Sequence, residues 1–129
     1  MTKERIARRV TFLIAVAAAS AANAQPANGS WVRTTAPELY AAYHDNEVAA
    51  DQTYKGKSLR IRGMVVGIAK DVLNHPYVSL AGSQFGTVHL QFGDRSASEL
   101  AKLHRGMNIE VTCRGDGMII GIPVLTCGN

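Results

Sequence analysis

The stretch that decides the fold is residues 54–71, Tyr-Lys-Gly-Lys-Ser-Leu-Arg-Ile-Arg-Gly-Met-Val-Val-Gly-Ile-Ala-Lys-Asp. Leu59 and Ile61 alternate with two arginines, which is the period of a strand with one solvent-facing side. Gly63 and Gly67 then interrupt an apolar run. Glycine inside a strand marks a bulge or a bend, and a strand shared by both sides of a small barrel has to bend. We therefore expect the first, long strand of a β-barrel here.

The rest of the chain supplies further strands, separated by turns that contain glycine, asparagine or proline. The expected strands are 58–69, 77–81, 87–92, 107–114 and 118–127. We interpret the Gly-Asp-Gly sequence at 115–117 as the turn between the last two strands. Pro123 is expected to bend the last strand or to place it at an edge.

Two capping boxes predict helices. Thr35-Ala-Pro-Glu38 is followed by apolar residues at helical spacing, which predicts a helix from Ala36 to about Asp51. Ser96-Ala-Ser-Glu99 predicts a short helix to about residue 104, with Gly106 as its C-terminal stop. Thr35 and Ser96 are each expected to cap the helix that follows.

The expected order is one helix, three strands, a short helix and two strands. A five-stranded Greek-key barrel with a helix between strands three and four is the OB-fold pattern, and mainly β is therefore the expected fold class. The Tyr54-Lys-Gly-Lys start, the Arg-x-Arg-Gly-x-Val-x-Gly-Ile run, Pro76-Tyr77-Val78-x-Leu80 and the late cysteine pair resemble the bacterial tRNA-anti-like family of OB-fold proteins. The resemblance covers about 39–127. It implies a frequently exported domain with a nucleic-acid ancestry, in a family with many members of unassigned role.

The first 24 residues have the layout of a secretory signal peptide. A start with four basic residues precedes an apolar run of about a dozen residues, and Ala22-Asn23-Ala24 supplies the small residues of a cleavage site. The apolar run is shorter than the roughly 20 residues of a permanent membrane anchor. We expect a signal peptide at 1–24, a linker at 25–34, an OB-fold domain at 35–129, and a periplasmic or secreted protein.

Removing residues 1–24 changes the charge. The segment holds four of the 14 basic and one of the 10 acidic residues, so the remainder has ten and nine, and a net charge of +1. A nearly neutral domain has no bulk attraction for a polyanion, which disfavours nucleic-acid binding.

The two cysteines, Cys113 and Cys127, lie close together near the C-terminus. In an exported protein an isolated pair most economically forms a disulfide. The alternative that the residues leave open is a pair of free, buried thiols.

No pattern of catalytic residues is found. The serines lack a nucleophile elbow, and the four histidines lack the spacing of metal ligands. The polar run His44-Asp45-Asn46-Glu47 points in several directions on a helix, so a solvated face is the simpler interpretation. We expect neither an enzyme nor a metal or other cofactor.

OB-folds bind ligands across strands two and three, between the loops that join strands one to two and four to five. On this sequence that face has few stacking rings and a mixed charge, unlike most single-strand binders. The expected ligand-binding residues are Lys70, His75, Tyr77, Ser79, His89, Gln91 and Arg114.

The sequence therefore predicts an exported, non-enzymatic binding module for a protein partner or a small polar or saccharide ligand. The alternative function is binding of single-stranded nucleic acid. An ordinary solvated sheet face without a ligand also remains open.

Overall fold

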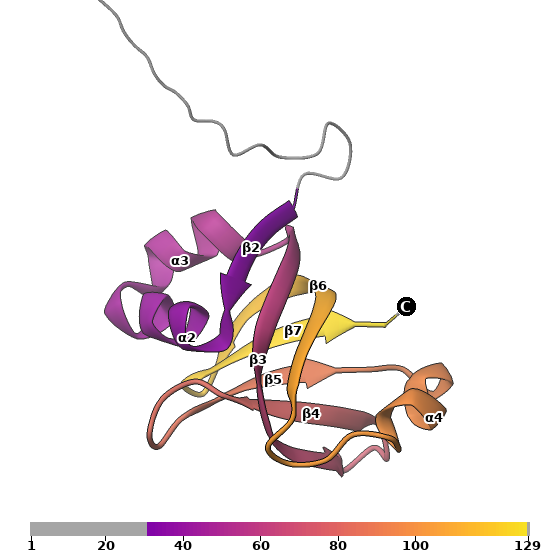
Figure 1. The fold of residues 1–129 in the computed structure, drawn as a ribbon. Helices are drawn as coiled ribbons and strands as arrows, with labels where there is room; N and C mark the ends of the chain where they lie inside the picture. The colour runs from indigo at the N-terminus through magenta and orange to yellow at the C-terminus, as the bar shows by residue number, and fades with distance from the viewer. Residues whose placement is uncertain (1–30, 129) are drawn as a thin grey trace, which may run out of the picture. The chain divides into compact units, whose positions relative to one another are not determined.

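The computed structural model describes residues 31–128. The expected signal peptide at 1–24, and the linker as far as Ser30, lie outside these residues. Six strands of the described part form one sheet that closes on itself, in the order β2-β3-β4-β5-β7-β6 with β3 also paired to β6 (Figure 1). The strands are β2 (Trp31–Thr35), β3 (Ser58–Lys70), β4 (Pro76–Ala81), β5 (Thr87–Gln91), β6 (Asn108–Ile119) and β7 (Ile122–Cys127).

The long strand β3 organises the barrel, as expected. Its first half pairs with β6, from Ser58 to Met64, and its second half pairs with β4, from Val65 to Lys70. Leu59 and Ile61 point inward and are fully buried. A register shift lies between Val65 and Gly67, where the strand bends onto its second partner.

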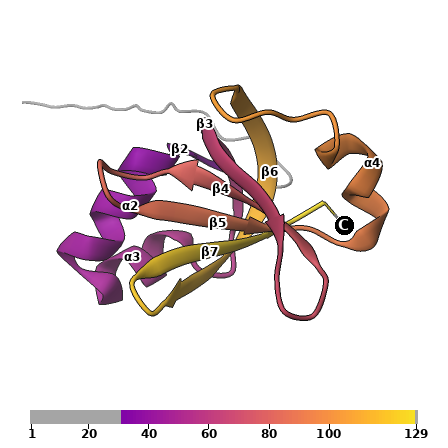
Figure 2. The same cartoon turned by 90° about the horizontal axis from the view of Figure 1, so that it is seen from below.

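The ring β3-β4-β5-β7-β6, with β5 and β7 parallel, is the connectivity of an OB-fold barrel. A short helical segment joins β5 to β6, and helices α2 and α3 lie at the opposite end of the barrel from it (Figures 1 and 2). The expected fold class is confirmed. The buried core gathers inward side chains from the strands, together with Ala36, Leu39 and Tyr43 of α2.

Residues 31–34 are not a linker, because Trp31–Thr35 forms a sixth strand, β2, parallel to β3. Val32 is the register partner of Leu59, and Thr34 that of Ile61, so this segment places two side chains on the core side of the sheet. Only two residues of this strand face the core, and one of them is a threonine, so the sequence shows no clear alternation of apolar and polar residues here.

The first capping box is confirmed. Thr35 accepts a hydrogen bond from the backbone N–H of Glu38, and the Glu38 carboxylate accepts one from the N–H of Thr35. The single helix predicted to Asp51 is instead two helices, α2 (Ala36–Asp45) and α3 (Glu47–Tyr54). Asn46 has an extended backbone and accepts from the N–H of Ala49, so it ends α2 and caps α3.

The second capping box is wrong. The segment forms a 3-10 turn, η2 (Asp94–Ser96), followed by α4 (Ala97–Leu100). Ser96 has a helical backbone and makes no capping hydrogen bond, because the preceding turn already includes it. Leu100 of this segment is nevertheless buried against the barrel.

The turn predicted at 115–117 is also wrong. Strand β6 continues through these residues with a register shift between Gly115 and Met118, and the hairpin turns at Ile120 and Gly121. Both turn residues have positive φ, 47° and 76°, as a two-residue type I′ turn requires. Isoleucine is rarely found in that conformation, so the sequence predicted the turn at Gly115 and Gly117 instead.

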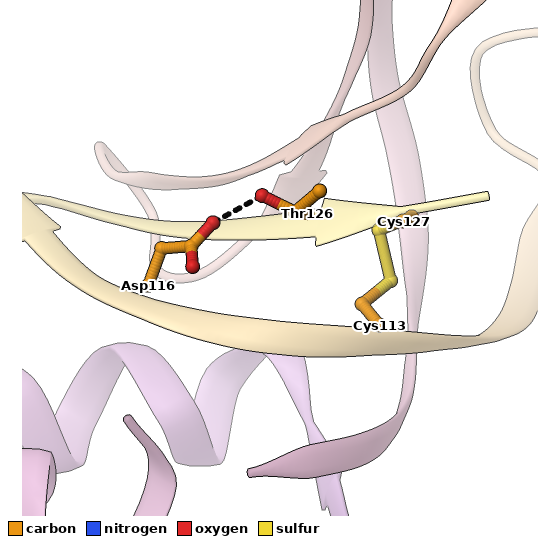
Figure 3. Close-up of a disulfide and its surroundings, with 4 residues drawn as sticks. All are labelled: Cys113, Asp116, Thr126 and Cys127. Carbon is orange, nitrogen blue, oxygen red and sulfur yellow. Dashed lines mark hydrogen bonds between the residues drawn. A yellow bond between two sulfur atoms is a disulfide. The ribbon is translucent and has the colours of Figure 1, made fainter. Parts of the chain in front are cut away.

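Cys113 and Cys127 are cross-strand partners in β6 and β7 and form the expected disulfide, with Cα atoms 4.2 Å apart (Figure 3). Both are buried. Within residues 31–128, none of the helices is long and apolar enough to cross a membrane.

Candidate ligand-binding face

Strand register brings polar side chains from four strands into one row on the outside of the barrel. Tyr77 of β4 is paired with Gln91 of β5, Gln91 with Thr126 of β7, and Thr126 with Arg114 of β6. Ser79 and His89 form the next pair on the same side. The intervening residues of β4 and β5 are buried. We call these six residues the polar face: Tyr77, Ser79, His89, Gln91, Arg114 and Thr126.

An aromatic pair lies at one side of the polar face. The rings of Tyr77 and His89 are stacked diagonally across β4 and β5, with centroids 4.8 Å apart and an interplanar angle of 28°. Burial of the imidazole lowers the pKa of His89 below its ordinary value. His89 is therefore neutral near pH 7, and it presents a hydrogen-bonding ring rather than a cation.

A surface hollow of about 280 Å³ adjoins the polar face. Its lining combines Gln91 and Thr126 of the face with the β3–β4 loop and the end of β5: Asp71, His75, Gln91, Phe92, Gly93, Thr126 and Cys127. Asp71 shapes that loop, because one carboxylate oxygen accepts from the backbone N–H groups of Leu73 and His75, both at 2.9 Å. The His75 ring nitrogen lies 3.8 Å from the other oxygen.

Asp116 holds the far end of the row in place. It lies 3.2 Å from the Arg114 guanidinium and accepts a hydrogen bond from the Thr126 hydroxyl (Figure 3). Thr126 was not among the predicted site residues. The predicted β6–β7 turn at 115–117 also concealed its contact with Asp116, since only a strand that runs on through 115–117 sets Asp116 beside β7.

The structure brings together six of the seven predicted site residues and separates the seventh. Tyr77, Ser79, His89, Gln91 and Arg114 share the polar face, and His75 lies in the adjoining hollow. Lys70 is the register partner of the buried Pro76 and lines a different hollow of about 250 Å³, beside Leu100 of α4. Whether any of these residues binds a ligand remains a prediction.

Within residues 31–128, no three side chains of the metal-ligating types His, Cys, Asp and Glu converge. His44, in the polar run of α2, is exposed, stacks on Tyr40 and lies with Nε2 2.9 Å from the carbonyl oxygen of Gly121. This contact ties α2 to the β6–β7 turn.

A second outward surface lies on β2, β3 and β6. Trp31, Arg33 and Thr35 of β2 are paired with Ser58, Arg60 and Arg62 of β3. The Arg60 guanidinium lies 4.7 Å from the centre of the Trp31 ring. Glu110 of β6 pairs with both Arg60, at 3.2 Å, and Arg33, at 3.8 Å. We call this surface the arginine face: Trp31, Arg33, Arg60, Arg62 and Glu110.

The sequence was compared with models of known protein families. The model of the tRNA_anti-like family matches residues 6–128. The chain belongs to the tRNA_anti-like family. This confirms the resemblance inferred from the strand and glycine pattern, and the family's OB-fold agrees with the barrel. No match is found among curated proteins.

Solved structures of other proteins share this architecture. A lipoprotein of Klebsiella pneumoniae subsp. pneumoniae MGH 78578, for which nucleic-acid binding has been proposed, is 22% identical, with a TM-score of 0.57 over 79% of this chain and 95% of that chain. A protein of Leishmania major Friedlin, proposed to be an aspartyl-tRNA synthetase, is 10% identical, with a TM-score of 0.52 over 81% of this chain and 21% of that one. At these identities the likeness establishes the fold.

Proposed function

We propose that this tRNA_anti-like protein is an exported, non-enzymatic binding module whose polar face holds a small polar ligand of the saccharide class. The observation that carries the proposal is the row Tyr77, Gln91, Thr126 and Arg114 beside the hollow at His75. Saccharides present hydroxyl groups to donors and acceptors and an apolar ring face to an aromatic side chain. The polar face offers both, on the strands where OB-folds bind oligosaccharides and oligonucleotides.

The composition of the polar face favours a neutral ligand. Arg114, its cation, is already paired with Asp116, and His89 is held neutral by burial. Export is supported by the pattern of residues 1–24, with its basic start, apolar run and Ala-x-Ala site. A non-enzymatic role is supported by the sequence, in which the serines lack a nucleophile elbow and the histidines lack metal-ligand spacing.

The experiment is an NMR titration of the purified, isotopically labelled protein with a panel of neutral mono- and oligosaccharides. We expect amide shift changes at Tyr77, His89, Gln91 and Thr126, and a loss of about tenfold in affinity for Gln91→Ala. Thr112→Ala, an exposed strand residue on the arginine-face side, is the matched control and should bind normally. Shifts confined to other surfaces would contradict the proposal. A partner protein captured by the wild type and lost by Gln91→Ala, with no saccharide response, would assign the polar face to a protein instead.

Single-stranded nucleic acid is the second candidate, and the arginine face is the observation that favours it. Three arginines and Trp31 share that face, where the carboxylates of Glu110 and Glu38 lie beside the arginines, and single-strand binders combine cations with stacking rings. The test is fluorescence anisotropy with labelled single-stranded oligonucleotides at a series of salt concentrations. Binding that weakens steeply with salt and is reduced by Arg60→Gln would support it. No binding at low salt would exclude it.

A further inference from the structure

Strand β3 changes neighbours along one of its edges, and this leaves an opening in the sheet. The pairing with β2 ends at Thr35 and Arg62, and the pairing with β4 begins at Val65 and Leu80. Gly63 and Met64, between these positions, are paired only with β6 on the other edge. Figure 1 shows β2 beside the upper part of β3 and β4 near its lower end.

A hollow of about 570 Å³ occupies this opening, twice the volume of the one beside the polar face. It is lined by Thr35, Pro37, Arg62, Gly63, Met64, Ala81 and Asn108, and we call it the β3 hollow. Its volume lies within the roughly 300–1,000 Å³ of small-molecule sites. Gly63, one of these residues, also packs closely on the core, because a Cβ there would lie 2.9 Å from the Cβ of Ala36 and 3.0 Å from Cδ1 of Leu80.

The walls of the β3 hollow are mostly apolar. Pro37, Met64 and Ala81 contribute hydrocarbon surface, and the Met64 side chain is left 42% exposed. Met107, next to Asn108 in the chain, is 38% exposed. An exposed methionine such as Met64 is flexible apolar surface that can adapt to a ligand.

The polar groups at the rim differ in whether they already have a hydrogen-bond or ion-pair partner. The Thr35 hydroxyl and the Glu38 carboxylate are engaged with each other's backbone in the capping box. Glu110 forms ion pairs with both Arg60 and Arg33. Arg62 makes no ion pair within residues 31–128, and its side chain is exposed at the rim. Arg62 and Asn108 are therefore the lining residues whose donor groups make neither an ion pair nor a side-chain hydrogen bond within residues 31–128, although Arg62 also lines a neighbouring hollow with Glu38 and Glu110.

We propose that the β3 hollow binds an amphiphilic anion, of the class of a free medium-chain carboxylate. Its head group is held by Arg62, whose planar fork matches a carboxylate, with Asn108 as a second donor. Its hydrocarbon chain lies against Pro37, Met64 and Ala81. A single uncommitted cation beside apolar walls suits one anionic group with an apolar body, whereas a polyanion would need a row of cations. This site is separate from the polar face and does not depend on its ligand.

The test is an NMR titration of the labelled protein with octanoate below its micelle concentration, with octanol and octylammonium as matched probes. We expect shift changes at 62–64, 81 and 108, saturable binding of octanoate, and weaker binding of the two other probes. Arg62→Gln should lose at least tenfold in affinity for octanoate while its spectrum stays folded. Arg95→Gln, an exposed arginine of η2, is the charge-matched control and should bind as the wild type does.

Three results would overturn the proposal. Equal binding of octanol and octanoate would show apolar adsorption without anion recognition. Shifts centred on other exposed apolar residues, such as Phe85 or Ile120, would place the amphiphile elsewhere. Binding to anionic phospholipid vesicles without any response to octanoate would assign the hollow to a membrane surface instead of a free carboxylate.

Discussion

Tyr77 and His89 stack on each other across β4 and β5, with ring centroids 4.8 Å apart. Diagonal ring pairs of this kind stabilise antiparallel strands, and here the partial burial of the imidazole disfavours its charged form. The stack links the stability of the barrel to the protonation of a residue on the candidate site.

The first prediction concerns acid sensitivity. The folded-state pKa of His89 lies below its unfolded value of about 6.5, so the unfolded chain binds the proton more readily. The contribution of His89 is complete above pH 6.5 and is lost as the pH falls below it. In urea unfolding over a pH series, His89→Gln should lose less stability on acidification than the wild type. Parallel curves for wild type and His89→Gln would contradict the prediction.

The second prediction concerns the disulfide. Cys113 and Cys127 are separated by 14 positions. A disulfide that closes a loop of that size reduces the conformational entropy of the unfolded chain and so stabilises the folded state by about 3 kcal/mol. The double variant Cys113→Ala/Cys127→Ala should lower the free energy of unfolding by about 2–4 kcal/mol. A reductant should produce a similar loss in the wild type and none in the double variant. Unchanged stability after verified reduction would show that the bridge is dispensable.

The third prediction concerns the β6–β7 turn. Ile120 has φ 47° and is 95% exposed, so a β-branched residue stands in a left-handed conformation with no packing to compensate. Asn-Gly is the preferred pair for such a turn, and Ile120→Asn should raise the free energy of unfolding by about 0.5–1 kcal/mol. Gly121→Ala, at φ 76°, should lower it. Thermal unfolding of both variants would check this, and a destabilised Ile120→Asn would refute it.

Local rules predicted most of the barrel. The alternation of Leu59 and Ile61, the bending of β3 near Gly67 and the capping of α2 by Thr35 each depend on neighbours in sequence, and each is found. The outward set on β4 and β5 follows from the same two-residue period, which explains why Tyr77 and His89 were assigned together.

The errors arise where a distant contact decides the local structure. Lys70 was grouped with the candidate site by its place in a loop, but pairing with Pro76 sets it on the other side of the sheet. Ser96 satisfies the capping pattern in sequence, yet it is the last residue of the 3-10 turn that begins at Asp94 and therefore does not cap α4. Thr126 joins the polar face through the parallel pairing of β7 with β5, where it is the partner of Gln91, and nothing near Thr126 in the sequence indicates that pairing.

The last prediction tests why β6 carries glycine at that point. A Cβ at Gly115 would clash with the carbonyl oxygen of Tyr54, at the end of α3, and a backbone atom cannot move aside as a flexible side chain can. The same segment is held by hydrogen bonds between Gly115 and the N–H of Gly56 and the carbonyl of Lys57. Gly115→Ala should therefore separate α3 from the barrel and lower the free energy of unfolding by about 2–3 kcal/mol.

Gly93→Ala is the matched control for that prediction, because a Cβ there would meet nothing within 4 Å. Its free energy of unfolding should stay within about 0.5 kcal/mol of the wild type. Urea unfolding of the two variants measures the difference. Equal stabilities would mean that α3 can shift at little cost, and the close approach of Tyr54 to β6 would then not be what requires glycine at 115. A selective loss in Gly115→Ala would instead show that the bulge at 115–118, which brings Asp116 beside Thr126, is maintained by the packing of α3 against it.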